Sequence, residues 1–281
     1  MNIRVSKQEL RAGEMSEAKV AQAMEAILID GYVILDDVVD HDHLDLLHGK
    51  MAEDSEILIR AEKWGGAGSL EGHLTQYPPP MMPYVFRDIV ANPFAIQVTK
   101  RLLPNGPNAR LGKMFNSYYN ANANCPGSLQ QALHMDWPHL WPGLDQAHPP
   151  YSLAINLCLG DVSEENGATE IWPGSHLNTK PIDDENVAAQ RRIAPPIRTE
   201  AEKGSLVIRD NRIWHRGMTN HSNEVRHMLH TVHNIYWRKR RRRPVRYLTG
   251  CEGEVGHPDL DPNATFEDEA FDYLFQEWVG S

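Results

Sequence analysis

The sequence predicts an α+β fold in which N-terminal helices support a mainly β core of jelly-roll type. Apolar residues recur at helical spacing in the N-terminal part, and many short strands separated by Gly, Pro and Asn follow from residue 111 onward. Helices first and strands afterwards are typical of an α+β chain whose body is a β-sandwich or barrel. The chain has 281 residues and no stretch of linker composition, so we expect one domain over residues 1–281.

Residues 16–110 are expected to form helical support around the core. The spacing predicts helices over residues 16–29, 38–51 and 88–103, the last interrupted at Asn92-Pro93, and a buried strand over residues 32–35. Ser16 is suited to cap the first helix. Residues 64–83 are rich in Gly and Pro and are expected to form a long mouth loop, because long loops in compact domains are often functional.

Residues 111–237 are expected to form the jelly-roll core. Strand patterns occur at residues 111–119, 129–136, 151–159, 169–172, 204–209, 213–215 and 225–237. Side chains alternate between the two faces of a strand. The last strand therefore places one set of side chains together: Arg226, Met228, His230, Val232, Asn234 and Tyr236.

Residues 238–281 are expected to be a mostly polar C-terminal extension. It begins with the basic run 238–243, which we interpret as a solvated surface segment, with a docking site for an anionic partner or substrate as the alternative. Near the end, four apolar side chains are spaced as in a short helix that docks on the body: Phe271, Leu274, Phe275 and Trp278.

The composition excludes several classes of protein. A formal net charge of -10 argues against a general nucleic-acid binder, which concentrates positive charge. The three cysteines are scattered and contain no Cys-x-x-Cys pair, which favours a reducing compartment over a disulfide framework or zinc knuckle. No stretch approaches the ~20 apolar residues of a membrane span, and no targeting signal is evident. We therefore expect a cytoplasmic protein that does not bind membranes, with a homodimer left open.

The triplet His134-Met135-Asp136 is the strongest candidate for a functional site. On a strand, residues two apart point to the same face, so an imidazole and a carboxylate converge on one point. His215 on a later strand is positioned to add a third ligand. Two His and one carboxylate are typical of non-haem Fe(II) sites, because they leave positions open for a cosubstrate and O2. We predict that His134, Asp136 and His215 bind iron.

Chance alone supplies some triplets of this kind. With 14 His and 38 acidic residues, roughly two His-x-Asp/Glu triplets are expected, and the chain has three. His43/Asp45 falls in an expected helix, where a two-residue step splays side chains apart. His257/Asp259 lies in the tail with no later His. His176 follows a turn and has no Arg at useful spacing, so it ranks below His215.

Arg226 strengthens the metal hypothesis. It follows His215 by eleven residues across one turn, so it can begin the adjacent strand and point into the same cavity. The planar guanidinium is suited to gripping a carboxylate by two hydrogen bonds. A dicarboxylic keto acid on the iron would present its far carboxylate there. The alternative is a surface Arg or a partner of a structural Asp.

These residues stand among motifs that resemble the phytanoyl-CoA dioxygenase family of Fe(II)- and 2-oxoglutarate-dependent oxygenases. The resemblance covers most of residues 20–236 in order. Its motifs are Asp30-Gly31-Tyr32-Val33-Ile34-Leu35, Pro126-Gly127-Ser128, Gln131, His134-Met135-Asp136, Glu165-Asn166-Gly167-Ala168, Pro173-Gly174-Ser175-His176, Gly204-Ser205-Leu206-Val207, His215-Arg216-Gly217, Asn220 and Arg226.

The resemblance implies a cupin-like double-stranded β-helix and a catalytic centre formed by His134, Asp136 and His215. It also implies that Fe(II), 2-oxoglutarate and O2 are used, that Arg226 binds the distal carboxylate of 2-oxoglutarate, and that Gln131 and Thr169 contact this cosubstrate. The hydroxyl-bearing residue common after the distal His in the family is not found here, because Gly217-Met218 precedes Thr219.

The implied reaction oxidises a C-H bond of a small molecule and yields succinate and CO2. Hydroxylation is the default, and desaturation, cyclisation and endoperoxide formation occur in similar enzymes. Related halogenases replace the carboxylate ligand, so Asp136 argues against halogenation. The Trp- and Pro-rich loop after Trp137 favours an apolar natural product, with an acyl-CoA or amino acid derivative as the alternative. We expect five side chains to line the substrate site: His73, Gln76, Asn116, Tyr118 and Trp137.

Two functions of other classes stay open on the sequence. A jelly-roll binding protein without turnover would keep the fold, because the same fold serves many functions. A Zn(II) hydrolase would use the same three ligands.

Overall fold

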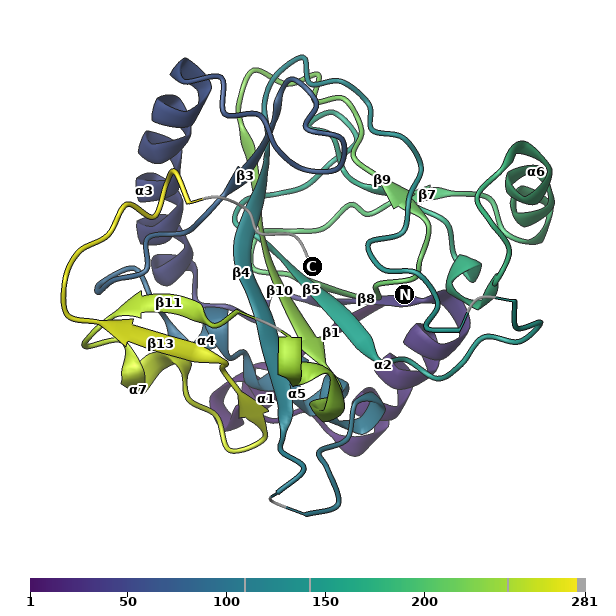
Figure 1. The fold of residues 1–281 in the computed structure, drawn as a ribbon, viewed down its shortest axis with the longest axis horizontal. Helices are drawn as coiled ribbons and strands as arrows, with labels where there is room; N and C mark the ends of the chain where they lie inside the picture. Colours follow the sequence, from purple (N-terminus) through teal and green to yellow (C-terminus); the bar gives the residue numbers. More distant parts are fainter. Residues whose placement is uncertain (109, 142, 242, 277–281) are drawn as a thin grey trace.

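The computed structural model describes residues 1–108, 110–141, 143–241 and 243–276. Within them, a curled, mixed main sheet forms the centre of the molecule, and a small sheet lies to one side of it (Figure 1). The main sheet has the order β1 (Asn2–Arg4), β2 (Tyr32–Asp36), β8 (Leu206–Asp210), β5 (Ser152–Cys158), β10 (Arg226–Asn234), β4 (Met114–Asn124) and β12 (Leu260–Asp261), with β3 (His73–Gln76) paired to β4. The small sheet has the order β7 (Ile197–Arg198), β6 (Glu170–Ile171) and β9 (His215–Arg216). This is the predicted jelly-roll arrangement.

Helices cover the outer face of the main sheet. The α-helices are α1 (Lys7–Ala12), α2 (Glu17–Asp30), α3 (His41–Arg60), α4 (Arg87–Val90), α5 (Pro93–Leu102), α6 (Asp184–Ile193) and α7 (Glu252–Val255). Of these, α6 lies beside the small sheet and not on the main one (Figure 1). Ile27 of α2, Leu47 of α3 and Phe94 of α5 share one buried cluster with Ile155 and Ile208 of the sheet. Burial of this apolar face holds the helices on the sheet. No helix among the described residues is long and apolar enough to cross a membrane.

The link between α2 and β2 is fixed by Gly31. It adopts a left-handed conformation (φ 86°) at the helix C-cap, which a residue with a Cβ atom rarely adopts. A Cβ there would also lie 2.7 Å from Nδ1 of His176. The predicted stop at Asp30-Gly31 is confirmed, and the chain enters the main sheet directly after it.

Alternation in the central strands separates the core from a cavity. On β5, Leu153, Ile155 and Leu157 enter the core beneath the helices, whereas Asn156 faces the cavity. On β8, Ile208 is in the same core and Arg209 faces the cavity. The predicted face of β10 is confirmed for four side chains, since Arg226, Met228, His230 and Val232 all line the cavity.

Several sequence expectations need correction. Strand β3 lies inside the expected mouth loop, and β4 continues to Asn124, beyond the expected end at residue 119. Residues 271–276 form no helix, and Trp278 lies outside the described residues. The C-terminal extension is not simply a tail. Strand β11 (Val245–Leu248) pairs with β13 (Ala264–Glu267), and β12 joins the main sheet beside β4.

Candidate metal centre and its cavity

His134 and His215 are brought together by a backbone bridge. The amide of His134 donates to the carbonyl of His215 at 3.0 Å, and the amide of His215 donates back at 2.9 Å. Residues opposite each other in an antiparallel pair place their side chains on the same face. The ring centroids accordingly lie 4.3 Å apart. The backbone pairing thus converts two distant histidines into one site.

The segment before Asp136 is not the regular strand that the sequence predicts. It is held by three backbone hydrogen bonds, in which the amides of Gln131, His134 and Trp137 donate to the carbonyls of Gly217, His215 and Asn211, respectively. These contacts lack the two-residue repeat of a regular ladder, so the segment is an irregular bridge. The convergence of His134 and Asp136 is nevertheless achieved.

Both imidazoles are oriented by their own backbone. Nδ1 of His134 donates to the Ala132 carbonyl at 2.9 Å, and Nδ1 of His215 donates to the Ile213 carbonyl at 3.0 Å. A carbonyl can only accept, so each Nδ1 carries the proton and each Nε2 keeps its lone pair. This is the tautomer that ligates a metal through Nε2.

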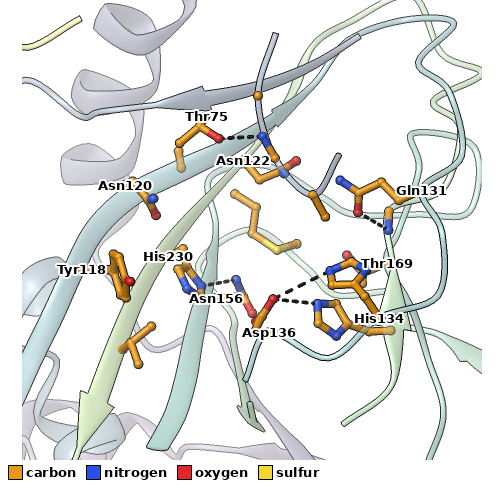
Figure 2. Close-up of a pocket in the computed structure, with 18 of the residues that line it drawn as sticks. Thr75, Tyr118, Asn120, Asn122, Gln131, His134, Asp136, Asn156, Thr169 and His230 are labelled. Atoms are coloured by element: carbon orange, nitrogen blue, oxygen red, sulfur yellow. Dashed lines mark hydrogen bonds and ion pairs between the residues drawn. The ribbon is translucent and has the colours of Figure 1, made fainter. Parts of the chain in front are cut away.

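Asp136 completes a group of three candidate metal ligands. Its Oδ1 atom lies 3.3 Å from Nε2 of His215 and 3.8 Å from Nε2 of His134. The three ligand atoms all lie within 4.8 Å of one another. The structure therefore brings together the three residues that the sequence singled out (Figure 2). Two neutral nitrogen donors and one carboxylate fit non-haem Fe(II).

The protonation states of Asp136 and His134 at neutral pH favour metal binding. Burial would raise the pKa of Asp136, but the charge of Arg209 outweighs this and holds the pKa well below 3.8. Burial, followed by the neighbouring His215, lowers the pKa of His134 to about 4. An ionised carboxylate and a neutral imidazole are the forms that coordinate a metal.

Arg209 is a site residue that the sequence reasoning missed. Its Nη2 donates to Oδ2 of Asp136 at 2.6 Å, and its Nε donates to Oδ1 of Asn156 at 3.1 Å. The amide of Asn156 in turn lies 3.1 Å from Nδ1 of His230. The signal was a single Arg at the end of an apolar strand, two residues from Val207 and so on the same face.

Arg226 is a buried cation without an acidic partner. It is 7% exposed, and its Nη2 donates to the Gly167 carbonyl at 3.2 Å. Its buried Nε has no hydrogen-bond partner, and no ion pair to it occurs among the described residues. Burial lowers the pKa of Arg226 to about 10, so the group stays charged at neutral pH. Its position in the cavity lining leaves it suited to an anion.

Gln131 and Thr169 also line the cavity. Oε1 of Gln131 accepts from the amide of Gly217 at 2.8 Å (Figure 2). A Cβ atom at Gly217 would lie 2.8 Å from that same Oε1 and 3.0 Å from the His73 ring. A larger residue directly after the His215-Arg216 strand would therefore displace the side chain of Gln131 or His73.

The cavity has a volume of about 910 Å³ and is bounded by both sheets. Of the five expected substrate-lining residues, Tyr118 and Trp137 are in its lining and His73, Gln76 and Asn116 are not. Thr75 lines the cavity, and its neighbour Gln76 points to the opposite face of the strand. There the side chain of Gln76 accepts a hydrogen bond from Ser55 and donates one to the Met51 carbonyl of α3. His73 is buried and bonds to the Leu129 carbonyl at 2.6 Å.

Asn116 is displaced by a β-bulge. The register of β10 against β4 shifts between Thr231, opposite Tyr119, and His233, opposite Asn116. The extra residue in β4 reverses the faces on either side of it. Asn116 thus shares the face of His233, which contacts Thr99 of α5, and its side chain accepts from the amide of Val232 at 3.1 Å.

The sequence profile of the phytanoyl-CoA dioxygenase (PhyH) family matches residues 29–228. A protein of Aspergillus fumigatus named dioxygenase af480 is 31% identical over 143 residues, which cover 50% of this chain and 41% of that protein. The matched region thus spans less than half the length of that relative.

Three solved structures are similar in fold. The non-haem α-ketoglutarate-dependent carbocyclase SnoK from nogalamycin biosynthesis has a TM-score of 0.56 and 20% identity, and the match covers 80% of this chain and 85% of SnoK. The epimerase SnoN from the same biosynthesis has a TM-score of 0.56 and 17% identity, and the match covers 78% of this chain and 82% of SnoN. AviO1 from Streptomyces viridochromogenes has a TM-score of 0.55 and 20% identity, and the match covers 78% of this chain and 96% of AviO1. At these identities the likeness concerns the fold, and it confirms the jelly-roll class.

Proposed function

The chain belongs to the phytanoyl-CoA dioxygenase family, and we propose that it uses Fe(II), 2-oxoglutarate and O2 to oxidise a C-H bond of a small molecule. The products would be succinate, CO2 and a hydroxylated, desaturated or cyclised substrate. We further propose a role in natural-product biosynthesis. The carbocyclase and epimerase of similar fold act in such a biosynthesis, which supports this role.

The observation that carries the proposal is the shared cavity of a three-ligand cluster and an unpaired buried cation. His134, His215 and Asp136 would hold iron through Nε2, Nε2 and Oδ1. Arg226 would bind the distal carboxylate of 2-oxoglutarate, since a buried guanidinium without an acidic partner is strongly stabilised by an anion. Gln131 and Thr169 lie in the same lining and are proposed to contact the cosubstrate.

The surrounding residues hold the reactants and control water. Iron held by His134, Asp136 and His215, together with 2-oxoglutarate, would activate O2 for the removal of hydrogen from the substrate. The Nδ1 bonds of His134 and His215 keep both rings in one orientation. Arg209 holds Oδ2 of Asp136, which leaves Oδ1 for the metal. Trp137, 9% exposed, closes part of the wall against solvent.

Anaerobic addition of Fe(II) and 2-oxoglutarate tests the proposal. We expect a weak visible charge-transfer band in the native protein and none in His134→Ala. Absence of the band in the native protein, or an undiminished band in His134→Ala, would contradict the iron assignment. A zinc hydrolase would instead be purified with zinc and act without O2.

Arg226→Met tests the cosubstrate site separately. We expect about 100-fold weaker binding of 2-oxoglutarate, because charge-assisted hydrogen bonds to a buried carboxylate are lost. Metal affinity should not change, since Arg226 is not a ligand. Calorimetric titration with Fe(II) and then 2-oxoglutarate, without O2, measures both constants. Unchanged affinity for 2-oxoglutarate would refute the role of Arg226.

A further inference from the structure

A row of polar side chains crosses the cavity wall. Asn120 of β4, His230 of β10 and Asn156 of β5 are direct cross-strand neighbours, because His230 pairs with both asparagines. All three line the cavity, as does Asn122 one step further along β4. Figure 2 shows Asn120 and Asn122 across the cavity from His134. Apolar residues would stabilise these central strands better, so the row needs an explanation.

The side-chain amide of Asn120 has no protein hydrogen-bond partner among the described residues. Asn120 is 9% exposed, and no side-chain hydrogen bond to it or to Asn122 occurs among the described residues. The amide opens into the cavity and is not one of the fully buried polar groups, so it is available to a ligand. Its amide can both donate and accept. A ligand with hydroxyl or carbonyl groups would satisfy it.

The described lining offers a substrate no free acidic group, whereas its cation Lys63 is exposed to solvent. Asp136 is the one acidic side chain in the described lining, and it is bound by Arg209. Arg226 is assigned to 2-oxoglutarate. Burial keeps His230 neutral by lowering its pKa to about 4. An ammonium group would therefore find no counter-ion beside the asparagines, and desolvating it would be unfavourable.

An apolar surface completes the cavity. Trp64 and Leu274 line it and pack together with Leu58, and Trp137 lines it beside Tyr118. Flat apolar side chains of this kind bind the faces of rings. The cavity thus combines neutral hydrogen-bonding groups on one wall with aromatic and aliphatic surface elsewhere.

We propose that the row Asn120–His230–Asn156, with Asn122, recognises the substrate, and that the substrate is a neutral ring compound bearing hydroxyl or carbonyl groups. This inference rests on the proposed function for the role of the iron. It excludes amino acids with a free ammonium group, and it narrows the expectation of an apolar natural product to an oxygen-bearing one.

Small ring fragments test the substrate class independently of shape. Cyclohexanediol, methylcyclohexane and cyclohexylammonium have the same ring and differ in their polar groups. Binding is measured by saturation-transfer NMR on protein loaded with Zn(II) and 2-oxoglutarate. Zn(II) is used because it binds the same types of side chain and does not react with O2. We expect cyclohexanediol to bind more tightly than methylcyclohexane, and cyclohexylammonium not to bind.

Asn120→Leu provides the decisive variant, because leucine has a similar size without the amide. We expect about fivefold weaker binding of cyclohexanediol, from the lost hydrogen bond, and unchanged or tighter binding of methylcyclohexane. Asn2→Leu, the same change on β1 outside this cavity, should alter neither. Binding of cyclohexylammonium, or equal losses for both neutral fragments in Asn120→Leu, would overturn the inference.

The two proposals fail in different ways. Loading with metal and 2-oxoglutarate is measured first by calorimetry, and its absence would contradict the proposed function. The polar row consists of protein side chains alone, so the fragment comparison is also made on protein without metal. A loaded protein that does not prefer cyclohexanediol would contradict the substrate class alone.

Discussion

At the scale of single residues, Arg209 controls how Asp136 is presented. The salt bridge of 2.6 Å occupies Oδ2, while Oδ1 faces the two imidazoles. Arg209 is 6% exposed and is held from its other side by Asn156, so the carboxylate has little freedom to rotate. Partners that orient a ligand in this way are typical of metal sites.

We expect Arg209→Met to weaken metal binding by about 10- to 100-fold, the usual effect of losing an orienting partner. Removing a nearby cation would by itself strengthen the attraction for a metal ion. A loss of affinity would therefore indicate that orientation dominates. Anaerobic Fe(II) titration measures it.

Arg209→Lys is the matched control for charge. The ammonium keeps the charge but lacks the planar fork that reaches both Asp136 and Asn156. We expect an affinity between those of the native protein and Arg209→Met. If Arg209→Met binds metal as tightly as the native protein, or more tightly, the orienting role is disproved.

At the scale of elements, Asn92 fixes the start of α5. Its Oδ1 accepts from the amides of Phe94 and Ala95, both at 3.0 Å. Its Nδ2 donates to the carbonyl of Asp88 at 2.8 Å, which ties the end of α4 to the start of α5. The sequence predicted this interruption from Asn92-Pro93, because proline suits the first helical position.

Asn92→Ala should lower the free energy of unfolding by about 2 kcal/mol, since a helix cap and a buried hydrogen bond are lost together. Ser16→Ala is the control. Ser16 occupies the N-cap of α2 but makes no side-chain capping bond, so we expect its substitution to cost well under 1 kcal/mol. Urea denaturation of both variants gives the comparison, and equal losses would disprove the capping account.

The bulge in β4 shows where element prediction fails. Alternation placed Asn116 beside Tyr118, and one extra residue moved Asn116 to the opposite face. A bulge of this kind carries no Gly or Pro signal here. Its position follows from the register against β10, which is a property of two strands.

At the scale of the whole molecule, acid stability depends on buried neutral histidines. His227 and His233 lie on the outer face of β10, where His227 contacts Ser55 and His48 and His233 contacts Thr99. Burial is the main cause that lowers the pKa of each to about 3. The unfolded chain, with pKa values near 6.5, therefore binds more protons below that pH.

The free energy of unfolding should consequently fall as the pH drops from about 6.5 toward 3. At pH 5 each buried histidine would contribute a loss of about 2 kcal/mol. In His233→Gln, the slope of the free energy of unfolding against pH should decrease by the amount that one titrating histidine contributes. Urea denaturation at pH 7, 6 and 5 measures this slope. A slope equal to that of the native protein would contradict the assignment of His233.

Most helices and core strands, the family and the three clustered residues His134, Asp136 and His215 could be predicted from the sequence. Periodicity and turn residues are local, and the His134-x-Asp136 spacing needs only one extended segment. Arg226 was also found from the sequence, because strand alternation after His215 places it on the inner face.

Which other side chains reach the cavity could not be predicted from the sequence. His73 and Gln76 are on the right strand, yet Gln76 faces α3 and His73 bonds beneath the lining. Arg209 and the row from Asn120 to Asn156 come from strands far apart in sequence. A strand's own sequence fixes alternation, whereas register, bulges and the partner strand fix which face meets the cavity, and those depend on packing between distant segments.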